Sequence, residues 1–160
     1  MIDPLHFRKV LSSYPTGVCV ITARGDDGRR HGMVVGSFTS ISLDPPLVGF
    51  FPATGSQTWL AMAEVGRFCV NVLAAAQLED CQRFAARGAD KFGDMSHGES
   101  PSGQPLFDGA LAWLDCTVEA THEIGDHFLV VGRVETLGRC EDGEPLLFFG
   151  GQYHRIGEHA

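Results

Sequence analysis

The chain has 160 residues, of which 44% are hydrophobic and 20% are charged. Such a chain buries about two-thirds of its unfolded surface, which predicts one domain over residues 1–160 and excludes disorder, collagen and coiled coil. Its 12 Lys and Arg against 20 Asp and Glu give a net charge of −8, which disfavours nucleic acid as a partner because like charges repel.

The chain opens with the signals of a short helix. Asp3 fits an N-cap, Pro4 fits the first helical turn, and Pro15 ends the helix. Apolar residues at spacings i, i+3, i+4 and i+7 form one face of this helix. They are Phe7, Val10, Leu11 and Tyr14.

Seven segments rich in Val, Ile, Leu, Phe and Thr follow and predict strands. Two of the segments between these strands, 25–28 and 141–144, have the Gly and Asp composition of hairpin turns. Neighbouring strands are therefore expected to pair antiparallel. The expected strands are 17–23, 32–43, 47–51, 67–73, 110–122, 128–137 and 145–156.

Two further helices are expected between these strands. One follows Ser56 and ends at Gly66, and the other spans 75–87 and ends at Gly88. Residues 96–105 concentrate Gly, Ser and Pro, which predicts a surface loop. Many strands with few helices favour a mainly β barrel over a doubly wound α/β sheet.

Membrane and metal-binding features are not apparent in the sequence. No apolar run approaches the roughly 20 residues of a membrane span, and the first residues lack the pattern of a secretory signal. We therefore expect a soluble, cytoplasmic protein. Because the five cysteines form no C-x-x-C pair and the seven histidines are scattered singly, we expect mostly buried free thiols and no metal site.

The segment Ala53-Thr54-Gly55-Ser56-Gln57-Thr58-Trp59 is the best candidate for binding phosphate. Neither G-x-G-x-x-G nor G-x-x-x-x-G-K-[ST] occurs in the chain. This small-residue segment instead runs into a helix whose free N–H groups and dipole attract anions, and its hydroxyls add donors. The alternative is that Ser56 only caps the helix.

The segment 31–43 carries four hydroxyls and two glycines, an unusual composition for a barrel strand. A planar heteroaromatic ligand would satisfy buried hydroxyls, and Gly36 would allow the backbone to approach it closely. The alternative is an edge strand whose Ser and Thr residues face water.

Two further positions carry candidate functional groups. His127 follows Gly125-Asp126 at the start of a strand, where an imidazole can orient a ligand or move a proton near neutral pH. Lys91 follows a helix end close to Arg87. The alternatives are a solvent-exposed loop histidine and solvated cations that the helix dipole favours. No Ser-His-Asp or Cys-His set can be assembled from spacing, which disfavours a hydrolase.

Several motifs occur in one order along nearly the full chain, from the first helix to Tyr153. They are Pro15-Thr16-Gly17-Val18, His31-Gly32-Met33, Ser37-Phe38-Thr39-Ser40-Ile41-Ser42-Leu43-Asp44-Pro45-Pro46-Leu47, Phe68-Cys69-Val70-Asn71-Val72-Leu73, Lys91-Phe92 and Gly125-Asp126-His127. This ordered set resembles the short-chain flavin reductase family, the reductase components of two-component flavin monooxygenases.

The resemblance implies an FMN-binding split barrel, which is a Greek-key antiparallel β-barrel with a few peripheral helices. It also implies a homodimer with the flavin at the subunit interface. Residues 53–59 would hold the phosphate and ribityl chain, Lys91 and Phe92 would close over the nucleotide, His127 would face the nicotinamide, and Tyr153 would help to hold NAD(P)H. The strand bordering the isoalloxazine ring would contribute Met33, Val34, Val35, Gly36, Ser37, Thr39 and Ser40.

The activity implied is NAD(P)H-dependent reduction of FMN or FAD by hydride transfer, with reduced flavin supplied to a separate monooxygenase. The resemblance does not decide between FMN and FAD or between NADH and NADPH. It also leaves open whether the flavin is a diffusing substrate or a tightly bound prosthetic group. Val34-Val35-Gly36 replaces the family's Thr-Ala-Asn or Thr-Ala-Ser, so one or two polar flavin contacts are lost or pass to the backbone. The alternatives are a non-catalytic flavin-binding sensor or electron carrier on the same barrel, and a barrel that binds an apolar ligand.

Overall fold

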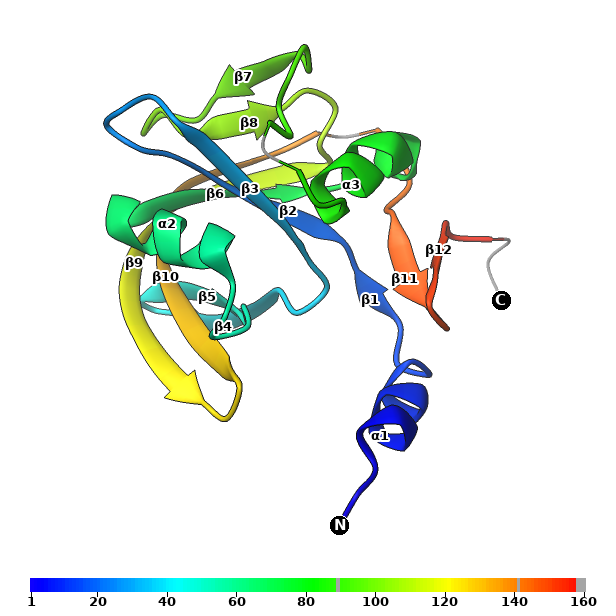
Figure 1. Cartoon of the computed structure of the whole chain (residues 1–160). Helices are drawn as coiled ribbons and strands as arrows, with labels where there is room; N and C mark the ends of the chain where they lie inside the picture. Colours follow the sequence, from blue (N-terminus) through cyan, green and yellow to red (C-terminus); the bar gives the residue numbers. More distant parts are fainter. Residues whose placement is uncertain (89, 141, 158–160) are drawn as a thin grey trace.

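In the computed structural model of the protein, residues 1–88, 90–140 and 142–157 are described. Strands predominate within these ranges and helices are few, which confirms a mainly β architecture (Figure 1). The helices are α1 (Pro4–Leu11), α2 (Gln57–Val65), the short 3-10 helix η1 (Ala75–Gln77) and α3 (Leu78–Ala85). The strands are β1 (Thr16–Gly17), β2 (Cys19–Arg24), β3 (Arg30–Val35), β4 (Thr39–Leu43), β5 (Pro46–Phe50), β6 (Arg67–Val72), β7 (His97–Glu99), β8 (Pro105–Phe107), β9 (Ala112–Ile124), β10 (His127–Arg139), β11 (Leu147–Phe149) and β12 (Gln152–His154).

Seven strands form one sheet in the order β3-β2-β6-β9-β10-β5-β4. All of its neighbouring pairs are antiparallel, as expected. Strands β1, β11 and β12 form a second sheet, and β7 pairs with β8. Over the described ranges no pairing joins β3 to β4, so the large sheet does not close into a complete ring and its two end strands have free edges.

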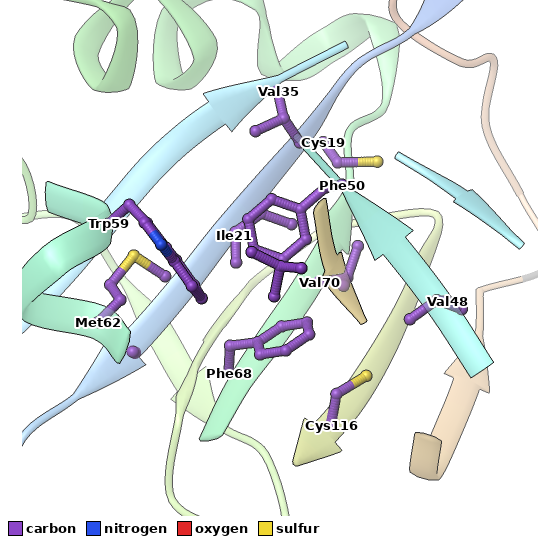
Figure 2. Close-up of a cluster of buried hydrophobic side chains, with 12 residues drawn as sticks. Cys19, Ile21, Val35, Val48, Phe50, Trp59, Met62, Phe68, Val70 and Cys116 are labelled. Carbon is purple, nitrogen blue, oxygen red and sulfur yellow. The ribbon is translucent and has the colours of Figure 1, made fainter. Parts of the chain in front are cut away.

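The large sheet curls around one hydrophobic core. Val35 of β3, at one end of the strand order, is buried in the same cluster as Val48 and Phe50 of β5, near the other end. Figure 2 shows these side chains together with Trp59 and Met62 of α2, which packs on β2, β3 and β6. Strands from both ends of a sheet can share one core only if the sheet is strongly curved, as in a barrel.

A second core lies on the opposite face of β2. Side chains alternate along this strand, so Ile21 belongs to the first core and Val20 to the second. Phe84 of α3 and Phe92 pack edge to face in the second core, with ring centroids 4.9 Å apart. A Cβ at Gly32 of β3 would lie 2.4 Å from the Phe84 ring, so only glycine lets α3 pack this closely. The second core thereby holds the segment around Phe92 close to β3.

Local end signals correctly predict where α1 and α2 begin. The Asp3 carboxylate accepts a hydrogen bond from His6 N at 3.0 Å, and the Ser56 hydroxyl accepts one from Trp59 N at 3.2 Å. Gly66 ends α2 with a φ of 70°, a conformation that favours glycine. These caps depend only on neighbours in sequence, which is why the sequence predicts them.

Helix α1 has an apolar face without a partner in the described chain. It ends at Leu11, before the predicted end at Pro15, and none of its residues is buried. Figure 1 shows α1 extending away from the curled sheet. The exposed large apolar side chains of the helix and of the residues that follow it are Leu5, Phe7, Val10, Leu11 and Tyr14.

The prediction of one strand over 32–43 is wrong. The segment forms two strands, because β3 ends at Val35 and β4 begins at Thr39. Strand β3 pairs with β2 and β4 pairs with β5, at opposite ends of the strand order, so the chain must leave one edge to reach the other. A Cβ at Gly36 would lie 2.8 Å from Thr16 Oγ1, so β1 approaches the chain closely where the strand breaks.

The prediction for the C-terminal segment 145–156 is also wrong in detail. It forms the hairpin β11–β12, with Gly150 and Gly151 at φ values of 60° and 81° in the turn. Strands β10 and β11 lie in different sheets, so the predicted hairpin between them does not form, and 142–144 belongs to a connection. Glu141 itself lies outside the described residues.

Two other predicted segments differ from the structure. Helix α3 ends at Ala85, before Gly88, and its predicted first turn is the 3-10 helix η1. The predicted loop 96–105 contains β7 and the start of β8, because strands of three residues are too short to show a periodicity. This hairpin is anchored by Asp115, whose buried carboxylate accepts hydrogen bonds from Ser102 N at 2.7 Å and Ser102 Oγ at 2.6 Å.

The cysteines are free, and four of the five are buried, as expected. Burial raises the pKa of Cys19 and of Cys69 to about 12, so both thiols stay protonated near neutral pH. Across the described ranges, no helix has the length and apolar character needed to cross a membrane.

Candidate active site

Three segments far apart in sequence meet at one corner of the barrel. Ala53 forms an antiparallel bridge with His127, and Thr54 donates to Asp126 O from its backbone N at 3.0 Å and from its hydroxyl at 3.2 Å. The Ser37 hydroxyl accepts from Phe51 N at 3.0 Å. The structure therefore brings Ser37 of the predicted ring-binding segment close to the predicted phosphate segment and the predicted catalytic histidine.

His127 is oriented by its own neighbour. Gly125, at a φ of 62°, and Asp126 form the two-residue turn between β9 and β10, in which His127 pairs with Ile124. His127 Nδ1 lies 2.7 Å from Asp126 Oδ1, and this hydrogen bond lowers the pKa of Asp126. With Nδ1 donating to the carboxylate, the Nε2 atom of the half-exposed imidazole is free for a ligand.

The predicted phosphate segment has open space beside it. Residues Gly55 and Gln57 are exposed, and a Cβ at Gly55 would meet nothing within 4 Å. Ser56 caps α2, as the alternative interpretation holds, but a hydroxyl that accepts one hydrogen bond can still donate another. The first N–H groups of a helix have no acceptor within it, so they can also bind an anion. Trp59 is buried in the first core, which leaves only its backbone near the segment.

Strand β3 is an edge strand beside an apolar recess. It pairs with β2 on one side, and over the described residues no strand pairs with its other side. A recess of about 170 Å³ lies next to it, in which the predicted residues Val34, Gly36 and Tyr153 meet. Val18 and Phe148, which sequence reasoning did not select, complete its lining. An apolar surface beside free backbone N–H and C=O groups suits a flat ring with a polar edge.

The other predicted ring-binding residues point elsewhere. Met33 and Val35 pack against the first core, so their side chains face away from the recess. Thr39 and Ser40 lie on β4 at the opposite end of the strand order, and both are exposed. Their exposure agrees with the alternative in which these hydroxyls face water.

A small cationic pocket lies at the start of β3, and we call it the cation pocket. Its volume is about 70 Å³, and it brings together the predicted residues Thr58, Lys91 and Phe92. Lys91 Nζ donates to Phe84 O at 2.7 Å, while Phe92 is buried. The remaining lining residues are Arg30, His31, Gly32 and Gly88. Sequence reasoning missed Arg30, although the basic run 29–31 in an acidic chain was a signal for it.

A larger cavity adjoins the recess. Its volume is about 800 Å³, and Tyr153 lines both spaces. Burial, reinforced by a hydrogen bond with Cys81, raises the pKa of Tyr153 to about 12, so the phenol is neutral near pH 7. Glu144, His154 and Arg155 supply charged and polar groups along the same cavity.

Phosphate binding at the cation pocket should depend on the charge of Lys91. Burial lowers the pKa of Lys91 from 10.5, so the ammonium loses its proton at a lower pH than an exposed lysine does. We expect the affinity for FMN, relative to that for riboflavin, to fall as pH rises towards 10.5. Lys91→Arg should remove this fall because a guanidinium stays charged. Fluorescence titrations across this pH range check both expectations, and equal pH profiles for the two flavins would contradict them.

A family model described as "Flavin reductase like domain" matches residues 11–157. The chain belongs to the flavin reductase family. It is 47% identical over 152 residues to a flavin reductase of Pseudomonas putida, covering 95% of this chain and 89% of that protein. It is also 47% identical over 155 residues to the reductase subunit HsaB of a flavin-dependent monooxygenase of Rhodococcus jostii, covering 97% of this chain and 79% of that protein.

Solved structures support the same family. The NADH:FAD oxidoreductase SgcE6 of Streptomyces globisporus, in complex with NAD and FAD fragments, superposes with a TM-score of 0.92 at 34% identity and covers 100% of this chain and 98% of that chain. These findings confirm the family resemblance, the split-barrel fold and the oxidoreductase class inferred from the sequence. The roles of individual residues in this flavin reductase remain predictions.

Proposed function

We propose that this flavin reductase uses NADH to reduce FMN or FAD and supplies the reduced flavin to a separate monooxygenase component. The observation that carries the proposal is the order in which three surfaces follow one another along β3. The cation pocket lies at Arg30–Gly32, the apolar recess lies at Val34–Gly36, and the corner with His127 lies beyond Ser37. This order matches a nucleotide with a charged end and a flat ring.

The residues present fit a flavin. Apolar side chains in the recess can cover one ring face, and the free edge of β3 can hydrogen-bond the polar edge of the ring through the backbone. Backbone bonding is needed here, because Val34 and Gly36 offer no polar side chain where the family has Thr and Asn or Ser. Ser56, Thr58 and Lys91 can hold the phosphate.

The protein contributes binding and orientation to the reaction. Bound flavin supplies the ring that accepts a hydride, and NADH supplies the hydride. His127, held through Asp126, would face the nicotinamide with its Nε2 atom, and the recess would exclude water from one side of the reacting rings. No general base is needed for hydride transfer, which accounts for a site of hydroxyls, glycines and one histidine.

Absorbance at 340 nm tests this function. Purified protein should oxidise NADH only when FMN or FAD is added, and the reduced flavin should reach an added oxygenase without direct contact between the two proteins. The same assay with NADPH tests the nicotinamide preference. Tightly held flavin that survives dialysis, together with no NADH oxidation, would instead support the sensor or electron-carrier alternative.

His127→Ala should raise the KM for NADH more than the KM for the flavin. Loss of one hydrogen bond from a half-exposed imidazole corresponds to about a fivefold to tenfold change, since such a bond is worth about 1 kcal/mol. Asp126→Asn is the matched variant, because it keeps the turn but weakens the bond that orients the ring. Steady-state kinetics with each substrate varied would show the reverse order of effects if His127 contacted the flavin instead.

The proposal includes a homodimer. Helix α1 carries an apolar face with no partner in the described chain, and Phe148 and Phe149 of β11 are also exposed. Gly150 N donates to Ser12 O at 2.9 Å, which attaches the end of α1 to the β11–β12 hairpin and makes one apolar region. A second copy would cover this region and the recess beside it. Sedimentation equilibrium should give twice the chain mass of 17.3 kDa, and a monomer at micromolar concentration would refute the dimer.

We also place the protein in the cytoplasm. NADH is available there, and free thiols such as those found here stay reduced. Fractionation of expressing cells, with detection of the chain by antibody, tests this location.

A further inference from the structure

Arg30 is held in place by two side chains from different parts of the chain. It begins β3 and is half-buried at the mouth of the cation pocket. Its Nη1 atom lies 2.9 Å from His97 Nε2, and its guanidinium carbon lies 5.0 Å from the centroid of the Phe92 ring. One contact fixes the guanidinium edge and the other fixes its plane, so the group has little freedom to turn.

The hydrogen bond between Arg30 and His97 defines the state of the histidine ring. An arginine side chain only donates hydrogen bonds, so His97 Nε2 accepts. His97 Nδ1 then donates to Gly98 O at 2.9 Å. Both ring nitrogens are used within the protein, and the ring packs edge-on against Phe92 with centroids 5.5 Å apart. His97 is therefore placed to orient Arg30, and neither of its ring nitrogens is free to bind a ligand.

The charge of Arg30 is available to a ligand. None of the salt bridges among the described residues includes Arg30. The charge of Arg30 helps to lower the pKa of Asp90, but the two form no salt bridge, and Asp90 Oδ1 accepts from Phe92 N at 3.2 Å and from Gly93 N at 3.0 Å. A guanidinium has five N–H donors, and His97 uses one of them.

The size of the cation pocket limits what it can bind. A volume of about 70 Å³ is close to that of two water molecules at about 30 Å³ each, so a nucleoside does not fit. A single phosphate group does fit, with the rest of its nucleotide outside. Arg30 and Lys91 supply positive charge and Thr58 supplies a hydroxyl donor, which suits phosphate in both charge and hydrogen bonding.

We propose that Arg30, oriented by His97, binds a phosphate group of the nucleotide in the cation pocket. This inference rests on the proposed function, because it takes the ligand to be a nucleotide of the flavin reductase reaction. The phosphate can come from the flavin or from the nicotinamide nucleotide, and both present the same chemistry to the pocket. Arg30 is thus a binding residue, and His97 is a positioning residue that acts through it.

Titration of Arg30→Gln with flavins that differ only in phosphate tests the proposal. Riboflavin, FMN and FAD are titrated by flavin fluorescence in the absence of NADH. We expect FMN and FAD to bind about tenfold more weakly and riboflavin to bind as before, because a charge-assisted hydrogen bond to phosphate is lost. Arg29→Gln is the matched control: Arg29 is exposed, does not line the cation pocket, and carries the same charge one residue earlier. It should leave all three affinities unchanged.

Each outcome of the titration has a definite meaning. If the flavin affinities do not change but the KM for NADH rises about tenfold, the phosphate in the pocket belongs to the nicotinamide nucleotide and the role of Arg30 stands. If neither changes, or if riboflavin weakens as much as FMN, the proposal is overturned. Flavin binding is measured without turnover, so this result is separate from the NADH oxidation assay that tests the proposed function.

The role of His97 is tested with two replacements. His97→Phe keeps an aromatic ring against Phe92 but removes the acceptor for Arg30, so it should weaken FMN severalfold without affecting riboflavin. His97→Gln places an amide oxygen near the former Nε2 and should restore FMN affinity to within about twofold. Thermal unfolding of both variants controls for folding. Equal affinities of the Phe and Gln variants for the nucleotide that Arg30→Gln weakens, measured as the FMN affinity or as the KM for NADH, would overturn the positioning role of His97.

Discussion

Replacing Ser56 with Asp is expected to weaken FMN binding by about tenfold to a hundredfold and to leave riboflavin binding unchanged. Aspartate is as good an N-cap as serine, so its carboxylate can still accept from Trp59 N and α2 stays capped. The new negative charge lies beside the proposed phosphate position, where repulsion between unit charges near a protein surface reaches about 1–4 kcal/mol. The variant therefore separates capping from phosphate binding.

Ser56→Asn is the control for this experiment. Asparagine also caps a helix but carries no charge. The Asn variant should therefore bind FMN much more tightly than the Asp variant does. Fluorescence titrations at low and high salt check the electrostatic origin, because screening should reduce the loss in the Asp variant. Equal FMN affinity in the Asp variant and the unmodified protein would remove the phosphate assignment from residues 53–59.

Replacing Asn71 with Leu is expected to lower the free energy of unfolding by about 2–4 kcal/mol. Asn71 lies on β6 and is fully buried. Its Nδ2 donates to Val20 O and to Thr22 Oγ1, both at 3.2 Å, and its Oδ1 accepts from Phe107 N at 2.8 Å. A leucine of similar size leaves the Phe107 N–H and the Val20 carbonyl without these partners in a dry core, and such groups cost about 1–3 kcal/mol each.

Urea unfolding checks this expectation. The midpoint should fall while the slope of free energy against urea stays the same, because the folded state remains compact. Thr121→Val on β9 is the control, since an exposed strand residue should change stability by no more than about 0.5 kcal/mol. A stability loss in the Leu variant no larger than that of the control would show that the Asn71 bonds contribute little.

Features set by sequence neighbours were predictable. The caps at Asp3 and Ser56, the end of α2 at Gly66 and the turn at 125–126 depend on a few adjacent residues. The mainly β class was predictable for the same reason, because β-branched and aromatic segments alternate with turn residues along the chain.

Features set by distant contacts were not predictable from pattern. The break at Gly36 depends on β1, whose Thr16 hydroxyl lies 2.8 Å from the position that a Cβ at Gly36 would take. The hairpin of β11 and β12 is a partial exception, since Gly150-Gly151 between apolar residues is a known turn signal that the strand prediction over 145–156 passed over. The exposure of α1 also escaped prediction, because periodicity shows that a helix has an apolar face but not what covers it.

For the candidate site, the sequence by itself determined the kinds of chemical group and the family to which the chain belongs. The hydroxyls of 53–58, the Gly-Asp-His turn and Lys91 are all visible as local motifs. Only the tertiary structure decided that Thr54 bonds Asp126, that Lys91 meets Thr58 and Arg30 in one pocket, and that His97 orients Arg30. The physical reason is that these contacts join residues as many as 72 positions apart in the sequence. Such residues meet only because the large sheet curves and packs on two cores.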